Sequence, residues 1–383
     1  MRRAIVVIAL CALVAGCKLK PHGLPDGGER GDGSSSSTGC GLVSGSGCHA
    51  VTPASCECEL AASAHLLSGR TAATSVTIGS KLIIVGGQAG GGALTGDTLG
   101  TVVGSDGTPG AWKSEPIPTP HANAAVAAVG SNVYIFGGEA GMAGSSDVFV
   151  GHVADDASVT YEATTALPAT RTQAGAAGSD SHAYLVGGKS DLSAAYDGQV
   201  LEVSVDAEGL VTGYAAATPL PEPRLRPSAV VLNGYLYVVG GLFTGAADTC
   251  AKDQVLFAKV NDDGSLGAWT ATTSVGTQPI GAVLVAGANR LYLVGGTGKY
   301  GDTAKDATGS VVDVGSVLEA EAKSDGTLGA WTRVGYLPDQ RYGHVAAIIN
   351  SKLLVFGGLI DSTQVLGDGY LATVNGDGSL SCP

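Results

Sequence analysis

Short runs of β-branched and aromatic residues, each ending in a pair of glycines, recur along the chain. The residues before each pair, such as Ile84-Val85 and Leu293-Val294, are apolar at consecutive positions, which is typical of strands buried on both faces. No segment keeps the period of a helix. The six glycine pairs lie at Gly86-Gly87, Gly137-Gly138, Gly187-Gly188, Gly240-Gly241, Gly295-Gly296 and Gly357-Gly358. A period of roughly 50 residues or slightly more predicts an all-β protein built from six repeats.

Other residues keep a fixed distance from each glycine pair. Asp-Gly turns such as Asp106-Gly107 and Asp325-Gly326 are hairpin signals, and each lies just before an aromatic residue. The aromatic position holds Trp112, Tyr161, Tyr214, Trp269 and Trp331, and Leu60 takes the place of the sixth. Sixteen residues before the first glycine, the repeats carry Arg70, His121, Arg171, Arg224, Pro279 and Arg341.

This combination of Leu-Pro, Arg, Gly-Gly, Asp-Gly and Trp resembles the kelch repeat of β-propellers over residues 57–383. The resemblance implies a six-bladed kelch-type β-propeller with four antiparallel strands per blade around a central channel. The last repeat passes its Asp377-Gly378 turn without a following Trp, whereas a spare segment precedes Arg70. Kelch propellers close by letting one terminus complete the blade of the other. We therefore expect the N-terminal strand to close the ring, with Leu60 at the missing aromatic position.

The cysteines fit an oxidising compartment. Once Cys11 and Cys17 are set aside, six remain, and the sequence does not choose among their pairings. They are Cys40, Cys48, Cys56, Cys58, Cys250 and Cys382. The kelch closure implies that Cys382 pairs with Cys58 or with Cys56, a link that contributes about 4 to 5 kcal/mol in the chain-entropy model. Cys56-Glu57-Cys58 lacks the usual zinc spacing, and we expect neither a metal nor a cofactor.

The first 16 residues read as a signal peptide, because the basic Met1-Arg2-Arg3 precedes an apolar run too short to cross a bilayer. The run ends in Val14-Ala15-Gly16-Cys17, which resembles the lipobox of bacterial lipoproteins and implies lipidation of Cys17. An ordinary signal peptide with an incidental cysteine is the alternative. Residues 17–55 read as the lipidated cysteine and a flexible Gly/Ser-rich linker, and residues 56–383 as the propeller. By the same resemblance, Lys18 favours the outer membrane of a bacterial cell envelope, with the propeller facing either the periplasm or the cell surface.

The repeated basic residues predict a ligand site. Strand direction places them, with the loops after each glycine pair, at one mouth of the channel. Arginine forks suit carboxylates, sulfates and phosphates, so an anionic ligand is one interpretation and structural ties between blades are the other. The predicted ligand-binding residues are Arg70, His121, Arg171, Arg224 and Arg341. The chain has 34 acidic against 21 basic residues, which argues against nucleic acid as a partner.

Two functions from different classes remain open. The first is a membrane-anchored, monomeric binding module for a protein or an anionic glycan. The second is a carbohydrate-active enzyme, because six-bladed bacterial kelch proteins include mutarotases that act on sialic acid. An enzyme needs a general acid or base near the channel mouth, and Glu139, Glu222 and Asp339 are the carboxylates expected there.

Overall fold

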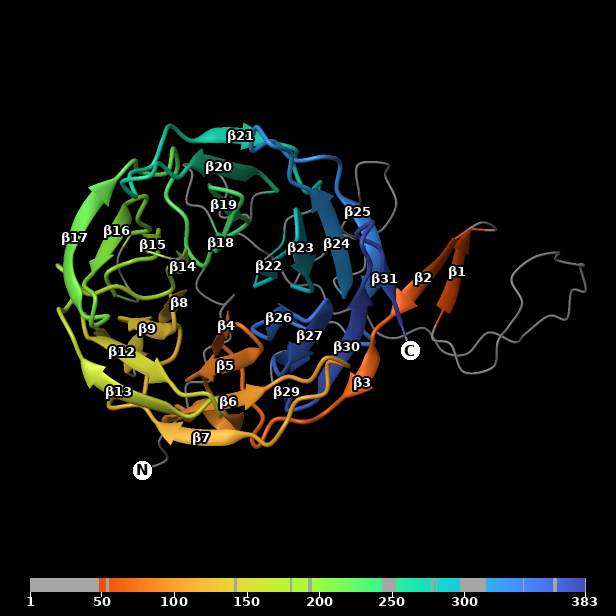
Figure 1. Cartoon of the computed structure of the whole chain (residues 1–383), viewed down its shortest axis with the longest axis horizontal. Coiled ribbons are helices and arrows are strands. Elements are labelled where there is room, and N and C mark those ends of the chain that lie inside the picture. Colours follow the sequence, from red (N-terminus) through yellow and green to blue (C-terminus); the bar gives the residue numbers. More distant parts are fainter. Residues whose placement is uncertain are drawn as a thin grey trace, which may run out of the picture.

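The computed structural model describes residues 48–52, 55–140, 143–179, 181–191, 195–242, 253–276, 279, 281–296, 315–339, 341–360 and 364–382. Within these residues the chain is almost entirely β-strand, and the one helical segment is the short 3-10 turn η1 (Gly90–Gly92). Six sheets stand around a central channel like the blades of a propeller (Figure 1). The predicted six-bladed architecture is confirmed.

Each blade is a four-stranded antiparallel sheet that runs from the channel outward, and we number the blades in chain order. Blade 1 holds β4 (Thr74–Ile78), β5 (Lys81–Val85), β6 (Asp97–Val102) and β7 (Lys113–Pro116). Blade 2 holds β8 (Ala125–Val129), β9 (Asn132–Phe136), β12 (Val148–Val153) and β13 (Val159–Ala163). Blade 3 holds β14 (Gly175–Gly178), β15 (Ala183–Val186), β16 (Val200–Val205) and β17 (Val211–Ala217).

The remaining blades repeat this order. Blade 4 holds β18 (Ser228–Leu232), β19 (Tyr235–Val239), β20 (Val255–Lys259) and β21 (Thr270–Thr272). Blade 5 holds β22 (Val283–Gly287), β23 (Arg290–Val294), β24 (Ser316–Glu321) and β25 (Thr332–Tyr336). Blade 6 holds β26 (Val345–Ile349), β27 (Lys352–Phe356) and β30 (Gly369–Val374). Two small hairpins, β10 (Glu139–Ala140) with β11 (Ala143–Gly144) and β28 (Leu359–Ile360) with β29 (Gln364–Val365), follow the glycine pairs of blades 2 and 6.

The core lies between neighbouring blades. The second strand of every blade is buried on both faces, as the apolar runs predict. One cluster joins Leu82 and Ile84 of blade 1 to Val345, Leu354 and Phe356 of blade 6. Apolar faces of adjacent sheets therefore stabilise the ring all the way round, and the fold needs no single central core.

The Asp-Gly turns connect the third strand to the fourth as predicted. In blade 1 the carboxylate of Asp106 accepts a hydrogen bond from the backbone N–H of Thr108, 2.9 Å away. Asp325 and Thr327 make the same contact in blade 5 at 3.0 Å. In blades 1, 4 and 5 the fourth strand begins at the residue after the tryptophan.

Both ends of the ring contribute to the outer strand of blade 6. The short strand β3 (Ala61–Ser63) pairs antiparallel with one half of β30, and β31 (Leu380–Ser381) pairs with the other half. A disulfide joins Cys58 to Cys382, with Cα atoms 5.5 Å apart. The expected closure by the N-terminal strand is confirmed, and the structure selects Cys58 over Cys56 as the partner.

One further hairpin extends blade 5. Strand β2 (Ser55–Glu59) runs parallel to β25, and β1 (Cys48–Thr52) pairs antiparallel with β2 at the outer edge (Figure 1). Residues 48–52 thus form a strand inside the segment predicted to be a flexible linker. The predicted signal peptide, Cys17, Cys40 and Cys250 lie outside the described residues. Among the residues that are described, no helix is long and apolar enough to cross a membrane.

Candidate functional site

The four repeat arginines are buried inside their own blades. Arg341 is fully buried: its Nη1 donates to the carbonyl oxygen of Gly357 and to Asp368, both at 3.0 Å, and its guanidinium lies over the ring of Tyr370. Nη2 of Arg341 donates to the second oxygen of Asp368 at 3.1 Å. The equivalent bonds to the first glycine of the pair join Arg70 to Gly86, Arg171 to Gly187 and Arg224 to Gly240.

The backbone at the same position ties one blade to the next. The carbonyl oxygen of Arg171 accepts a hydrogen bond from the N–H of Gly138 in the preceding blade at 2.8 Å. Arg224 and Gly188 repeat this contact between blades 3 and 4, also at 2.8 Å. Each arginine therefore holds its own blade through the side chain and the preceding blade through the carbonyl. These contacts assign the arginines to the framework, and anion binding by them stays a prediction.

Blade 2 has a histidine where the other blades have arginine. His121 is 3 % exposed, and its Nε2 lies 3.9 Å from an oxygen of Asp147. Burial lowers the pKa of His121, and the charge of Asp147 opposes that shift only in part. At neutral pH the imidazole is therefore uncharged, and His121 does not add to a cationic ring.

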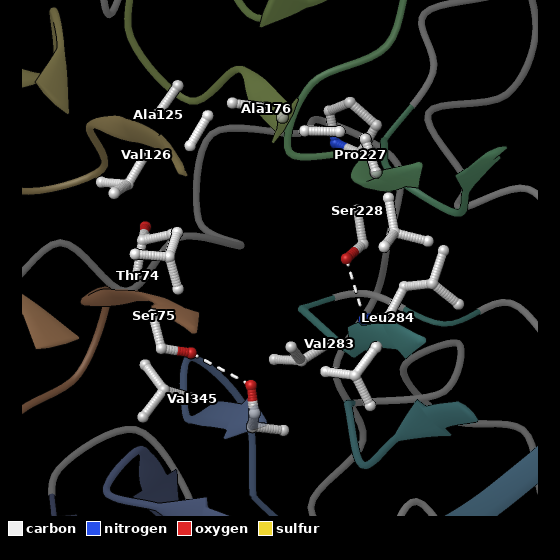
Figure 2. A pocket seen from close by; sticks show the side chains of 18 of the residues that line it. Thr74, Ser75, Ala125, Val126, Ala176, Pro227, Ser228, Val283, Leu284 and Val345 are labelled. Carbon is white, nitrogen blue, oxygen red and sulfur yellow. Dashed lines mark hydrogen bonds between the residues drawn. The ribbon is translucent and has the colours of Figure 1, made fainter. Parts of the chain in front are cut away.

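The channel is surrounded by the six innermost strands and has a volume of about 440 Å³. Its wall carries small side chains such as Ala125, Ala176 and Val283 (Figure 2). Hydroxyl groups bridge neighbouring strands, since Ser75 donates to the carbonyl of Ala346 at 3.0 Å and Ser228 accepts from the N–H of Leu284 at 2.9 Å. Each innermost strand pairs with one neighbour only, so its free edge faces the channel.

Backbone hydrogen bonds join neighbouring blades at one mouth of the channel. They involve residues two positions after the repeated Arg, His or Pro of each blade, and we call the six residues at this position the mouth ring: Ala72, Asn123, Gln173, Arg226, Gly281 and Gly343. Ala72 donates to Gly343 at 3.0 Å, and Asn123 donates to Ala72 at 3.4 Å. Gln173 donates to Asn123 at 3.0 Å, and Arg226 donates to Gln173 at 2.8 Å. Four successive blade boundaries are joined in this way.

All six residues of the mouth ring have left-handed backbone conformations, with φ between 52° and 66°. Glycine adopts this conformation freely, as in blades 5 and 6, whereas other residues pay roughly 1–2 kcal/mol. Blades 2, 3 and 4 nevertheless place Asn123, Gln173 and Arg226 there. Left-handed non-glycine residues are found preferentially at ligand sites, although Ala72 shows that this fold also accepts one without a polar side chain.

The polar members of the mouth ring contact a group of buried charges. Asn123 donates a hydrogen bond from Nδ2 to Oε1 of Glu139, and Nε of Arg226 donates to Oε1 of Gln173 at 3.0 Å. Gln173, Glu139 and Lys189 are 4 %, 6 % and 8 % exposed. We call these five residues, Asn123, Glu139, Gln173, Lys189 and Arg226, the polar cluster.

The charges of the polar cluster act on one another. Burial lowers the pKa of Lys189 and of Arg226, and the nearby carboxylate of Glu139 opposes the shift in both. Within the described residues, Oε2 of Glu139 is buried and has no hydrogen-bond partner. A buried carboxylate oxygen without a donor is costly, so this atom offers an acceptor to an incoming ligand.

The three carboxylates that the sequence predicted near the channel mouth have different surroundings in the structure. Glu139 belongs to the polar cluster. Asp339 instead accepts the hydroxyl of Tyr370 at 3.0 Å within the Arg341 network, and Glu222 lies close enough to Arg224 to act on its pKa. Sequence reasoning missed Asn123, Gln173, Lys189 and Arg226. The signal was present, because polar residues occupy in three repeats a position that is glycine in two others.

Comparisons with known proteins identify the fold. No protein-family model matches the chain, and no curated protein matches it. A solved structure titled "Structure of YjhT" aligns with a TM-score of 0.65 and 15% sequence identity, covering 83% of this chain and 99% of that chain. At that identity the likeness shows the six-bladed propeller fold alone. Within the described ranges, no group of three or more His, Cys, Asp or Glu side chains is arranged to hold a metal ion.

Proposed function

We propose that this protein is a membrane-anchored extracytoplasmic binding module whose ligand, a protein segment or a glycan, binds at the channel mouth over the polar cluster. The observation that carries the proposal is a set of polar residues whose backbone is left-handed and whose side chains gather near Glu139. Oε2 of Glu139 has no hydrogen-bond donor within the described residues. A binding function explains why blades 2 to 4 keep Asn123, Gln173 and Arg226 where glycine costs less.

The polar cluster indicates the ligand's chemistry. Lys189 and Arg226 are cations at the channel mouth, and a guanidinium pairs well with a carboxylate or a sulfate. Nε of Arg226 is held by Gln173, so the outer part of the guanidinium is fixed in direction. The free oxygen of Glu139 accepts a hydroxyl or an amide donor. An acidic sugar or an acidic peptide segment supplies both groups.

Binding on glycan and peptide arrays tests the proposal. We expect Arg226→Gln to weaken binding of any ligand found by about 10- to 100-fold, as for loss of a charge-assisted hydrogen bond. Lys113→Gln is the matched control, because Lys113 is a 42 % exposed cation outside the polar cluster. Equal affinity of wild type and Arg226→Gln for such a ligand, with the fold intact, would contradict the proposed site.

The anchor has its own test. The lipobox-like Val14-Ala15-Gly16-Cys17, the Gly/Ser-rich segment after it and a disulfide typical of oxidising compartments support lipidation at Cys17. We expect Cys17→Ser to abolish partitioning of the full chain into the detergent phase of Triton X-114. Unchanged partitioning would remove the anchor from the proposal and leave the binding site untouched.

The second candidate is a carbohydrate-active enzyme resembling a sialic acid mutarotase. Glu139 favours it, because a buried carboxylate at the mouth of a channel suits a general acid or base. Anomer exchange of sialic acid followed by NMR, with and without the protein, tests this activity. We expect acceleration by wild type and none by Glu139→Gln if the enzyme assignment holds, and equal rates with and without wild type would retire it.

A further inference from the structure

Both ends of the ring meet in one junction between blades 5 and 6. Strand β2 is held by blade 5, where Cys58 lies opposite Gly335, and the N–H of Leu60 donates to the carbonyl of Tyr336 at 3.0 Å. Strand β3, which begins three residues after Cys58, is held by blade 6. Strand β31 pairs with blade 6 from the other end. We call residues 58–63 together with 380–382 the clasp.

The clasp is packed as well as hydrogen-bonded. Cys58 and Leu60 are 5 % and 2 % exposed, and they lie in one apolar cluster with Leu337 of blade 5 and Tyr370 and Leu380 of blade 6. The disulfide then closes the chain covalently over a separation of 324 residues. From Cys58 to Cys382 the propeller is a covalent circle, and the preceding residues leave this circle at Cys58.

We propose that the clasp carries mechanical force. A pull on the segment that precedes Cys58 is divided at the disulfide between the two ends of the ring. The propeller therefore stays closed while a ligand at its mouth is pulled. The mechanical role rests on the proposed anchoring, which supplies the pull, whereas the division of load follows from the covalent circle.

The topology explains why one end alone is weak. Without the disulfide, a pull at Cys58 loads one end of the chain alone. It meets two residue pairs with β25, the bond from Leu60 to Tyr336 and three pairs with β30. Beyond these, the N–H groups of Leu66 and Arg70 donate to the backbone that leads into β30. With the disulfide, the same pull also enters β31 and the far end of blade 6. A handle in blade 3 then cannot separate from the N-terminal segment unless both arcs of the circle open together.

Single-molecule pulling on the full chain tests this inference. One handle is attached ahead of β1, and the other at Ala169, an exposed residue on the loop that enters blade 3. The arcs are then residues 58–169 and 169–382. Because forced rupture follows the unfolding rate along the loaded path, we expect the oxidised protein to rupture at a force up to about twice that of the reduced protein. Reduction inside the instrument compares the same molecules and does not depend on a variant that folds poorly.

A second loading geometry sharpens the test. If the first handle is moved to a segment added after Pro383, the pull reaches the same disulfide, so the oxidised protein should rupture at the same force from either end. In Cys382→Ser the two ends should give different forces. Equal forces with and without the disulfide, or unequal forces from the two ends of the oxidised protein, would overturn the inference. Neither outcome bears on detergent partitioning or on ligand binding.

Discussion

The hydroxyl of Tyr237 in blade 4 donates a hydrogen bond to the carbonyl oxygen of Gly326 in the Asp-Gly turn of blade 5, 2.9 Å away. The same contact recurs at three other blade boundaries, in the pairs Tyr134–Gly209 at 2.7 Å, Tyr184–Gly264 at 2.7 Å and Tyr292–Gly378 at 3.1 Å. Burial raises the pKa of Tyr237 to about 12, so the hydroxyl keeps its proton and acts as the donor. These contacts join neighbouring blades on the face opposite the channel mouth.

The buried tyrosine contact should contribute measurably to stability. Tyr237→Phe removes the donor and leaves the carbonyl of Gly326 buried, so we expect a loss of about 1–3 kcal/mol in the free energy of unfolding. Tyr235→Phe is the matched control, because that hydroxyl is exposed and lies 3.4 Å from the carbonyl of Ser324. Denaturant titration of both variants measures the difference. Similar losses for the two would show that the buried bond has no special role.

Glycine at the accepting turn is needed for space as well as for conformation. Gly326 has a φ of 85°, and a Cβ atom added there would overlap the rings of Phe257 and Tyr235 in the preceding blade, where Phe257 is buried in a packed cluster. Gly234 has a similar φ of 76° but open space around it. We expect Gly234→Ala to cost about 1–2 kcal/mol from the backbone alone and Gly326→Ala to cost clearly more. Equal shifts in melting temperature would contradict the close contact between blades 4 and 5.

The repeat features that the sequence predicted correctly are those set by local backbone geometry. Gly137 and Gly138 have φ of 58° and 97°, and a side chain at Gly137 would meet the backbone of Arg171 in the next blade. Such positions admit only glycine, so the pattern survives in every repeat and fixes the strand phase. The same phase placed Cys382 near the N-terminal segment. It did not distinguish Cys58 from Cys56, because that choice depends on the pairing of β2 with β25.

The roles of the arginines were harder to predict. Three of them have a carboxylate partner at a nearly constant spacing: Asp97 lies 27 residues after Arg70, Asp368 lies 27 after Arg341, and Asp197 lies 26 after Arg171. Arg224 breaks the pattern, because its side chain bonds Gln254. The phase was therefore present in the sequence, but burial of the arginines was not visible there, and an arginine at a channel mouth resembled a ligand contact. The mouth ring was missed because its backbone conformation is repeated while its side chains differ from blade to blade.

Replacement of Arg341 should test whether its role is structural. Arg341→Met leaves Asp368 without its guanidinium partner, and we expect a loss of about 3 kcal/mol, near the lower end for breaking a buried pair because Asp368 is 27 % exposed. Arg341→Met with Asp368→Asn should lose less than Arg341→Met alone. Thermal melts and ligand affinity are measured on the same variants. An unchanged melt with lost affinity would instead place Arg341 in the ligand site.

The same pair predicts an acid-dependent stability. Burial alone would raise the pKa of Asp368, but the hydrogen bonds and charge of Arg341 hold it below its ordinary value of 3.8. The stabilisation is therefore complete above that pH and is lost as the pH falls through the lowered pKa. In Arg341→Met this contribution should disappear. Unfolding free energies measured from pH 5 down to pH 2 by denaturant titration would show a smaller acid loss in the variant than in wild type.

His344 should make stability depend on pH at a higher range. It is 2 % exposed, its Nε2 lies 3.1 Å from the carbonyl of Val294, and burial lowers its pKa to about 3. The unfolded chain binds a proton at this residue near pH 6.5, so stability falls as the pH drops below 6.5, by up to about 1.4 kcal/mol per pH unit. His344→Ala introduces the residue found at this position in blade 1, Ala73, and should flatten the dependence between pH 6.5 and pH 4.

Gln173 offers a test that separates stability from binding. Its left-handed φ of 56° penalises any residue with a Cβ, whereas its side chain holds Arg226 at the proposed ligand site. Both Gln173→Ala and Gln173→Gly remove that contact, so they should weaken ligand binding to a similar extent. The glycine variant should nevertheless be the more stable of the two by about 0.5–1 kcal/mol, because relief of the left-handed strain exceeds the extra entropy of glycine in the unfolded chain.

Ala72→Gly is the control, since it relieves the same conformation without touching the polar cluster and should leave affinity unchanged. If Gln173→Gly is less stable than Gln173→Ala, the mouth ring stores no backbone strain. If Ala72→Gly loses affinity, the ligand is bound through the backbone of the mouth ring and not through the polar side chains of blades 2 to 4.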